Sequence, residues 1–266
     1  MAAAHPFLRG LAPTLLIAHR GGAALAPENT VLAFESAIRE YRADVLELDV
    51  HACRDGELVV AHDHTLERCT DGEGPLAALT YAELARLDAG HRFSPDGGQS
   101  FPFRGRGVRI PRLSDVLRAL PDARLNVELK ADAPGVADAF AELVRGAGAT
   151  ERLCVGSEHD TLAEQLWRAL PEACHFYPRE ALTAIVLALK FGAEPPAAPY
   201  QVLDMPLYHE GMRLVDEALL AGCAGLGKWV NVWTVDDPAE MRALIAEGVG
   251  GIITDRPDRL AAALGR

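Results

Sequence analysis

The segment Val45-Leu46-Glu47-Leu48-Asp49-Val50 places two acids inside an apolar strand. Successive side chains of a β-strand point to opposite faces, so Glu47 and Asp49 share one face and Leu46, Leu48 and Val50 share the other. In a parallel barrel the apolar face packs against helices and the polar face points inward, and barrel enzymes keep their catalytic groups at the carboxyl ends of the strands. This strand therefore favours a barrel with two carboxylates near its mouth.

The rest of the chain alternates short apolar runs with amphipathic helical patterns. The predicted strands are Thr14–Ala18, Asp44–Val50, Arg124–Leu129, Arg152–Gly156, Ala173–Phe176, Tyr200–Leu203, Trp229–Trp233 and Gly250–Thr254. The helical patterns lie near residues 30–41, 113–119, 134–148, 159–169, 179–191, 211–222, 237–247 and 257–264. Eight strands alternating with eight helices in 266 residues predict an α/β fold, a (β/α)8 TIM barrel. A doubly wound open sheet is the alternative.

One region interrupts this alternation after the second strand. Glu57–Ala61 is predicted to pair with the second strand in a hairpin across Asp55-Gly56, a strong turn signal. Residues 64–110 show no clear periodicity and are rich in Gly, Pro and Arg. A segment of this length without periodicity usually has a function, so we predict a small insertion lying over one end of the barrel. We expect residues 1–266 to form a single domain with its insertion at about 64–110.

Charge and composition restrict the partners. The sequence has 26 basic and 38 acidic residues, a formal net charge of −12. A field of that sign opposes nucleic acid and anionic lipid, and no run of Lys and Arg overrides it. We therefore expect a small-molecule substrate, no nucleic-acid partner and no stable membrane association.

The N-terminal sequence and the cysteines indicate the compartment. Met1–Thr14 carries little positive charge, Leu15–Ala18 is too short for the apolar core of a signal peptide, and no segment approaches the ~18–20 apolar residues that cross a bilayer. The five cysteines are scattered and never CxxC-spaced, which favours buried free thiols over a disulfide framework or a zinc site. We expect a cytoplasmic protein.

The third strand repeats the arrangement of the second, because Asn126, Glu128 and Lys130 share one face. Glu47, Asp49 and Glu128 would repel one another in a common mouth and raise one another's pKa values. One divalent cation would neutralise them, and oxygen-only ligands favour Mg²⁺ or Ca²⁺. The alternative is an internal ion-pair network with Lys130, or solvent exposure at the strand ends.

Two histidines are predicted at the same mouth. His19 ends the first strand and His62 ends the hairpin strand, and each suits proton transfer near neutral pH. Arg20 can bind a phosphate through two hydrogen bonds. Taken alone, each histidine is more simply explained by a structural role. Together with the three acids and Arg20, the two histidines indicate catalysis. His51 is the least certain of the remaining histidines, since it shares the inward face of Asp49.

Trp233, at the end of the seventh predicted strand, has two interpretations. It can form a wall against the carbon skeleton of a substrate, or it can belong to the core.

Several motifs together resemble the glycerophosphodiester phosphodiesterase family over essentially the whole chain. They are Ile17-Ala18-His19-Arg20-Gly21-Gly22, Pro27-Glu28-Asn29-Thr30, Glu47-Leu48-Asp49-Val50, Val59-Val60-Ala61-His62-Asp63, Asn126-Val127-Glu128-Leu129-Lys130, Val232-Trp233-Thr234-Val235 and Ile253-Thr254-Asp255-Arg256-Pro257. The chain departs from the usual family pattern at Cys53-Arg54 and at Arg112-Leu113-Ser114-Asp115, both outside the acids and histidines.

The resemblance implies a (β/α)8 barrel that hydrolyses glycerophosphodiesters to an alcohol and sn-glycerol 3-phosphate. It implies a divalent cation held by three acids, which are Glu47, Asp49 and Glu128. It further implies that His19 and His62 are the catalytic histidines and that Arg20 and Lys130 contact phosphate. We expect His19 to be the base and His62 the acid, with water or the neighbouring glycerol hydroxyl as the nucleophile.

Three other functions are compatible with a barrel. A lysophospholipase D or a phosphoinositide-cleaving phospholipase C would be favoured by an apolar rim on the insertion, for which Phe93, Phe101 and Phe103 are candidates. A non-catalytic binding barrel should have lost an acid or a histidine, and none is missing. A barrel that binds phosphate through backbone amides needs a glycine-rich turn after the last strands, whereas the glycines at 248–251 lie before and at the start of the eighth.

Overall fold

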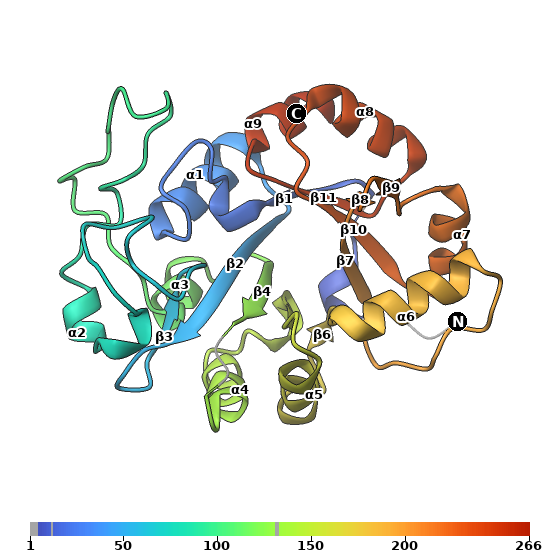
Figure 1. Cartoon of the computed structure of the whole chain (residues 1–266), viewed down its shortest axis with the longest axis horizontal. Helices are drawn as coiled ribbons and strands as arrows, with labels where there is room; N and C mark the ends of the chain where they lie inside the picture. Colours follow the sequence, from blue (N-terminus) through green and yellow to red (C-terminus); the bar gives the residue numbers. More distant parts are fainter. Residues whose placement is uncertain (1–4, 12, 131–132) are drawn as a thin grey trace.

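Eight parallel strands form the centre of the computed structural model, which describes residues 5–11, 13–130 and 133–266. The strands are β1 (Leu15–Ala18), β2 (Val45–Ala52), β4 (Leu125–Leu129), β5 (Leu153–Gly156), β6 (Cys174–His175), β7 (Val202–Pro206), β10 (Trp229–Trp233) and β11 (Gly251–Thr254). They stand side by side in chain order, and β11 pairs with β1 (Figure 1). A single parallel bridge, Phe176 to Val202, joins the β6 and β7 sides. The predicted (β/α)8 barrel is confirmed, and a doubly wound open sheet is excluded.

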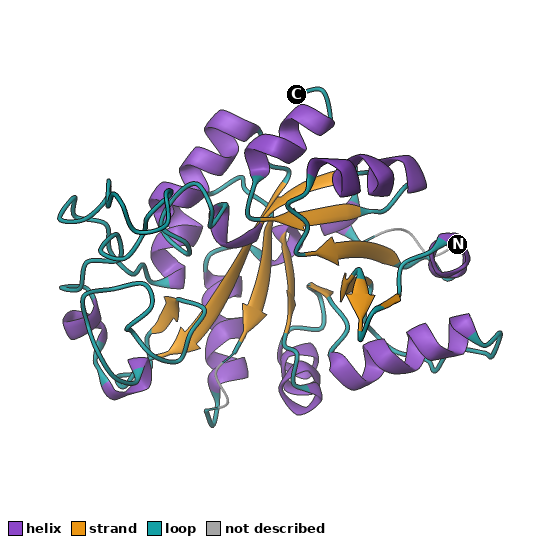
Figure 2. Cartoon of the chain, turned by 45° about the horizontal axis from the view of Figure 1, so that its top comes forward, coloured by secondary structure: helices purple, strands orange, loops and turns teal. Residues whose placement is uncertain are grey.

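A ring of helices surrounds the strands (Figure 2). The helices are α1 (Val31–Tyr41), α3 (Leu113–Ala119), α4 (Val136–Gly146), α5 (Asp160–Ala169), α6 (Arg179–Lys190), α7 (Glu217–Gly225), α8 (Pro238–Glu247) and α9 (Pro257–Ala263). The first begins where the sequence predicts, because the Thr30 hydroxyl accepts a hydrogen bond from the backbone N–H of Ala33.

The prediction of a helix over 211–222 is wrong in its first part. Residues before Glu217 form a two-stranded hairpin, β8 (Tyr208–His209) with β9 (Met212–Arg213). Gly211 adopts φ +79° at the turn, a conformation that a helix does not contain. Asp216 then begins α7, since its carboxylate accepts the N–H of Leu219 at 2.9 Å.

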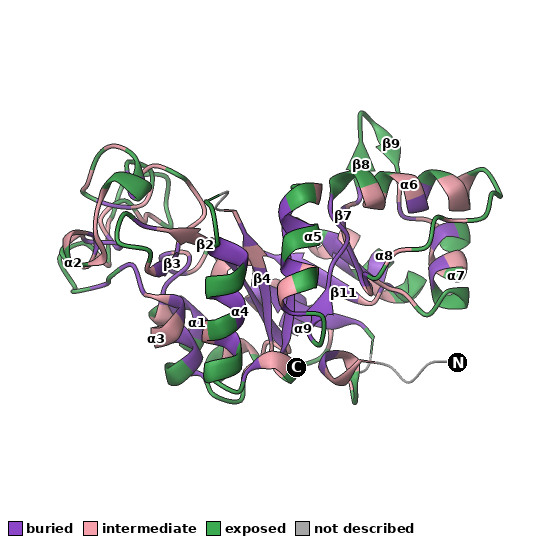
Figure 3. Cartoon of the chain, turned by 90° about the horizontal axis from the view of Figure 1, so that it is seen from below, coloured by how far each residue is buried: buried purple, intermediate pink, exposed green. Residues whose placement is uncertain are grey.

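Two apolar layers hold the barrel together, and the strands between them are buried (Figure 3). The layer between strands and helices contains the fully buried rings of Phe34 and Phe140. The layer inside the barrel is smaller and consists of Phe7, Leu15, Ile17, Val45, Cys154, Cys174, Phe176, Val202 and Ile253. All five cysteines are free and four of them are buried, as predicted.

The insertion follows a short antiparallel strand, β3 (Leu58–Val60), which pairs with the end of β2 and confirms the predicted hairpin. Residues 64–110 contain the 3₁₀ turn η3 (Leu76–Ala78) and the four-residue helix α2 (Tyr81–Leu84), and are otherwise irregular. The insertion has its own small core, formed by Cys53, Val59, Leu66, Leu76, Leu84, Ala89, Val108 and Ile110. That the chain forms one domain stays a prediction.

No helix within the described ranges is both long and apolar enough to pass through a bilayer. The expectation that Met1–Thr14 holds no signal peptide partly concerns residues 1–4 and 12, which lie outside the described residues.

Candidate active site

The register of β2 with β4 gathers the three predicted acids at the carboxyl end of the barrel. Asp49 lies beside Glu128 and Glu47 beside Asn126 on the two parallel strands. The side chain of Asp49 is 2% exposed. Asn29, just before α1, donates its amide to Asp49 Oδ2 at 2.9 Å and helps to satisfy this buried carboxylate.

Two basic side chains reach the same carboxylates. Lys130 Nζ lies 3.3 Å from Asp49 Oδ1 and 2.9 Å from Glu128 Oε2. Arg20 Nε lies 3.4 Å from Asp49 Oδ2, and Arg20 Nη1 donates to Glu28 Oε1 at 3.0 Å. The ion-pair network that the sequence left open for Lys130 is therefore present.

The acids nevertheless exceed the charge that these cations balance. Burial, followed by the charge of Asp49, raises the pKa of Glu47 to about 8. Oxygen donors with surplus negative charge have the chemistry that Mg²⁺ or Ca²⁺ requires, so the residues fit such an ion. Across the part of the chain that the structure describes, however, no three His, Cys, Asp or Glu side chains already stand close enough to hold a metal. The three acids therefore fit a divalent cation by the chemistry of their oxygen atoms, and not by a ligand geometry that is already formed.

His19 is held by a carboxylate from the opposite end of the chain. Its Nδ1 lies 2.6 Å from Asp255 Oδ1, and its Nε2 lies 4.0 Å from Glu47 Oε2. Because an ionised carboxylate only accepts hydrogen bonds, Asp255 fixes the proton on Nδ1 and leaves Nε2 facing the acids. Burial alone lowers the pKa of His19, but the bond to Asp255 and the charge of Glu47 outweigh it and raise the pKa overall.

The backbone after His19 requires glycine. Gly21 has φ +84°, and a Cβ at this position would lie 2.8 Å from the Cβ of Ala33 on α1. The close packing of this turn on α1 brings the backbone N–H of Arg20 to within 2.9 Å of Glu47 Oε2.

His62 is held in the same way by its neighbour in sequence. Its Nδ1 lies 2.7 Å from Asp63 Oδ1, and Arg68 Nε donates to Asp63 Oδ2 at 2.6 Å. Burial opposes ionisation of Asp63, but its bonds to Arg68 and His62 lower its pKa to about 2. Arg68 also binds both oxygens of Glu28, at 2.6 and 2.7 Å. The insertion thus connects His62 with Glu28, which in turn holds Arg20.

Two further sequence expectations concern single residues. His51 places Nε2 2.9 Å from the carbonyl oxygen of His62, so it supports the backbone of that residue. Trp233 is 44% exposed at the end of β10 and does not belong to the core. Its contact with a substrate stays a prediction.

The residues that orient the others were not predicted from the sequence. Asp255, Asp63, Glu28 and Asn29 lie within the motifs, and Arg68 lies five positions after Asp63. The contact of Asp255 with His19 depends on the closed barrel, because 236 positions separate the two residues. The available signal was position, since Asp255 directly follows the last strand and Asp63 directly follows His62.

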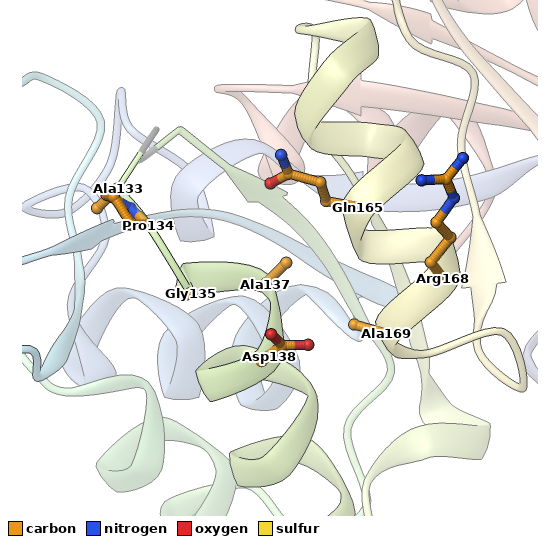
Figure 4. A pocket seen from close by; sticks show the side chains of 8 residues that line it. All are labelled: Ala133, Pro134, Gly135, Ala137, Asp138, Gln165, Arg168 and Ala169. Atoms are coloured by element: carbon orange, nitrogen blue, oxygen red, sulfur yellow. The ribbon is translucent and has the colours of Figure 1, made fainter.

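Large surface hollows lie away from these residues. The one in Figure 4, about 600 Å³, lies between α4 and α5 and is lined by Asp138, Gln165 and Arg168 among others. A second, about 730 Å³, lies at the amino ends of β2 and β4. Both lack acids paired with histidines, so we place the site by its chemistry and not by the size of a hollow.

The structure is a (β/α)8 barrel that carries acids, basic side chains and two carboxylate-paired histidines at the carboxyl ends of its strands. The sequence model described as "Glycerophosphoryl diester phosphodiesterase family" matches residues 19–259. The chain therefore belongs to this family of phosphodiesterases, and the predicted enzyme class is confirmed.

Known relatives cover nearly the full chain. A glycerophosphodiester phosphodiesterase of Caldanaerobacter subterraneus subsp. tengcongensis is 34% identical over 93% of this chain and 96% of its own length. A solved glycerophosphoryl diester phosphodiesterase domain from Mycobacterium tuberculosis has a TM-score of 0.83 at 25% identity, covering 95% of this chain and 99% of that one. A phosphodiesterase from Oleispira antarctica, solved with the product sn-glycerol 3-phosphate, has a TM-score of 0.73 at 23% identity, covering 96% and 98%.

Proposed function

We propose that the chain hydrolyses glycerophosphodiesters to an alcohol and sn-glycerol 3-phosphate, with His19 and His62 transferring the protons. One observation carries the proposal. Each histidine has its own carboxylate partner, at 2.6 and 2.7 Å, at the barrel end that also holds the acids. Such pairs orient an imidazole and stabilise its protonated form.

Binding of the phosphate is assigned to Arg20 and Lys130. The Nε of Arg20 is buried and makes no hydrogen bond among the residues that the structure describes, although it lies 3.4 Å from Asp49 Oδ2. Lys130 contacts Asp49 and Glu128 through single ammonium contacts that a phosphate oxygen can share. Both groups neutralise charge that grows on the phosphoryl oxygens. Trp233 is assigned to the wall around the substrate's carbon skeleton.

The two carboxylate partners suggest which histidine is the base and which is the acid. Asp63 shares its charge with Arg68. Asp255 has no Lys or Arg side chain on its carboxylate among the described residues. Asp255 therefore stabilises a newly formed imidazolium better, which favours His19 as the base. His62, whose carboxylate partner is shared with Arg68, is then assigned as the acid toward the departing alkoxide.

In this assignment one P–O bond forms and one breaks. His19 Nε2 takes the proton of the nucleophile, water or the neighbouring glycerol hydroxyl, and His62 protonates the oxygen that leaves. With water this step gives sn-glycerol 3-phosphate and the alcohol directly. With the glycerol hydroxyl it gives a cyclic phosphate and the alcohol, and water then opens the cyclic phosphate to sn-glycerol 3-phosphate by a second exchange of one P–O bond for another. Glu47, Asp49 and Glu128 would hold one divalent cation, Mg²⁺ or Ca²⁺. When bound, such an ion supplies positive charge next to the phosphate.

We further propose a single-domain cytoplasmic enzyme acting on small molecules. The free cysteines of the described residues support a reducing compartment.

The alternative lipid substrates receive less support. Phe93 and Phe103 stack edge to face with ring centroids 5.4 Å apart, and the guanidinium of Arg104 covers the ring of Phe101. These rings contact neighbours in the insertion and do not form an exposed apolar rim.

The test uses the purified full chain. It is treated with EDTA and then assayed on glycerophosphocholine and lysophosphatidylcholine, with Mg²⁺ and Ca²⁺ restored separately. We expect release of sn-glycerol 3-phosphate from glycerophosphocholine with at least one of the two ions. The double variant His19→Ala/His62→Ala is the control for contaminating activity. Equal turnover by that variant, or cleavage of the lysolipid alone, would refute the proposal.

A further inference from the structure

A chain of amides and one carboxylate crosses the interior of the barrel below the acids. Asn126 Nδ2 on β4 donates to Asp204 Oδ2 on β7 at 2.7 Å, and Asn231 Nδ2 on β10 donates to Asp204 Oδ1 at 2.7 Å. Since β4 and β7 are not neighbours in the sheet, the first bond spans the lumen. We refer to Asn126, Asp204 and Asn231 as the floor.

One acceptor of the floor is left over. Asn126 is 3% exposed, and its Oδ1 is buried without a hydrogen-bond partner in the described part of the chain. The assignment of oxygen and nitrogen follows from chemistry, because ionised Asp204 only accepts and must therefore face the NH₂ group. A buried acceptor without a donor is unfavourable, so this oxygen suits a ligand that brings a donor.

The floor adjoins the proposed reaction centre. Asn126 lies beside Glu47 in the strand register and two residues before Glu128 on the same face. Asp204 is only half-buried, and each of its oxygens accepts one amide, so lone pairs remain for another donor. Asn231 Oδ1 is already occupied, because it accepts the indole N–H of Trp229 at 3.0 Å.

We propose that the floor is a hydroxyl-binding subsite, in which Asn126 Oδ1 and the Asp204 carboxylate accept the free hydroxyls of the glycerol arm. This inference rests on the proposed function and specifies how the substrate is oriented. The floor presents acceptors and one negative charge, so it repels phosphate and matches a polyol. Arg20 and Lys130 present donors and positive charge, so they match the phosphate. The two halves of a glycerophosphodiester thereby face chemically opposite surroundings.

Two chromogenic diesters test the subsite. Glyceryl p-nitrophenyl phosphate carries the hydroxyls, and n-propyl p-nitrophenyl phosphate has the same leaving group without them. We expect Asn126→Ala to lower kcat/KM for the glyceryl ester about 10- to 100-fold and to leave the propyl ester within about twofold, because only the former loses a hydrogen-bond acceptor. Asp204→Asn, which keeps the volume, should act in the same direction.

The controls separate the possible failures. Cys154→Ala removes a buried lumen side chain next to Asn126 in register without removing an oxygen, and should leave both esters unchanged. Thermal melting shows whether each variant folds, and Asp204→Asn carries the test if Asn126→Ala does not fold. Equal losses on both esters would overturn the subsite, since the floor would then only support the barrel. A wild type that cleaves neither ester would refute the proposed function, and the subsite with it. A wild type that cleaves only the glyceryl ester uses the glycerol hydroxyl as its nucleophile, and an unchanged kcat/KM of Asn126→Ala on that ester would then overturn the subsite.

Discussion

Replacing Asp255 by Asn tests whether a carboxylate directs His19. The change keeps the size of the side chain but replaces an acceptor by an amide that can donate. The amide NH₂ can then donate to Nδ1 of His19, which moves the imidazole proton to Nε2, the nitrogen that faces Glu47. In that tautomer His19 cannot take a proton from the nucleophile.

The geometry sets the size of the effect. The 2.6 Å contact is a short, charge-assisted hydrogen bond, and the Asp255 side chain is 29% exposed, so water weakens its field. In serine proteases, where the acid of the histidine–carboxylate pair is buried, the wrong tautomer lowers kcat by ~10⁴-fold. For the more exposed Asp255 we expect kcat to fall about 10²–10³-fold, which corresponds to about 3–4 kcal/mol of transition-state stabilisation.

The assay measures kcat and KM on glycerophosphocholine at saturating Mg²⁺ or Ca²⁺. We expect kcat to fall and KM to change little, because Asp255 acts on the proton and not on substrate binding. Asp138→Asn is the matched control, since it makes the same change in the outer hollow between α4 and α5. A folded Asp255→Asn enzyme within threefold of wild-type kcat would show that the carboxylate does not direct the imidazole.

Four further outcomes are expected. His19→Ala and His62→Ala should each reduce kcat ~10²–10⁴-fold without lowering the melting temperature much, measured by steady-state assay and calorimetry. Glu47→Ala should remove the activity that Mg²⁺ or Ca²⁺ restores after EDTA, as ion titration would show. Burial raises the pKa of Asp204 from its ordinary value of 3.8 to about 6, so this acid destabilises the fold as pH rises from the lower value to the higher one. Relative to wild type, Asp204→Asn should therefore gain about 2 kcal/mol in free energy of unfolding between pH 4 and 7, measured by urea titration. Phe34→Ala, which empties a fully buried position, should cost about 3–5 kcal/mol in the same titration.

Each of these expectations has an outcome that contradicts it. Near-normal turnover in both histidine variants would remove the acid–base assignment. If the ion concentration that restores the wild type also restored the activity of Glu47→Ala, Glu47 would not be a metal ligand. A pH-independent difference for Asp204→Asn would mean that Asp204 titrates normally in the folded state. A loss below about 1 kcal/mol for Phe34→Ala would mean that the outer layer closes around the missing ring.

The strands and the placement of the acids follow from local rules, which explains why the sequence predicts them well. Alternation in a strand is a property of neighbouring residues, so Glu47 and Asp49 reveal their common face without any tertiary information. The failure to predict the hairpin at 208–213 also has a local cause. A single glycine turn there outweighs the helical spacing of the surrounding residues.

The orienting residues could not be found in this way. Asp255 stands 236 positions after His19, and only closure of the ring brings the two together. The bridge from Asn126 to Asp204 crosses 78 positions and the whole lumen. Residues on one face of a strand recur at every second position, so the sequence shows them. Contacts between strands on opposite sides of a barrel produce no such repeating pattern in the sequence.

The pairing of β1 with β11 has a consequence for how activity arises during synthesis. The ribosome delivers β1 early and β11 near the end, yet the imidazole of His19, which follows the first strand, is held by Asp255, which follows the last. Under the proposed role of His19 as the base, a growing polypeptide carries this histidine long before the acid that orients it is in place. Hydrolytic activity should appear together with ring closure, which makes turnover a direct reporter of the final folding step.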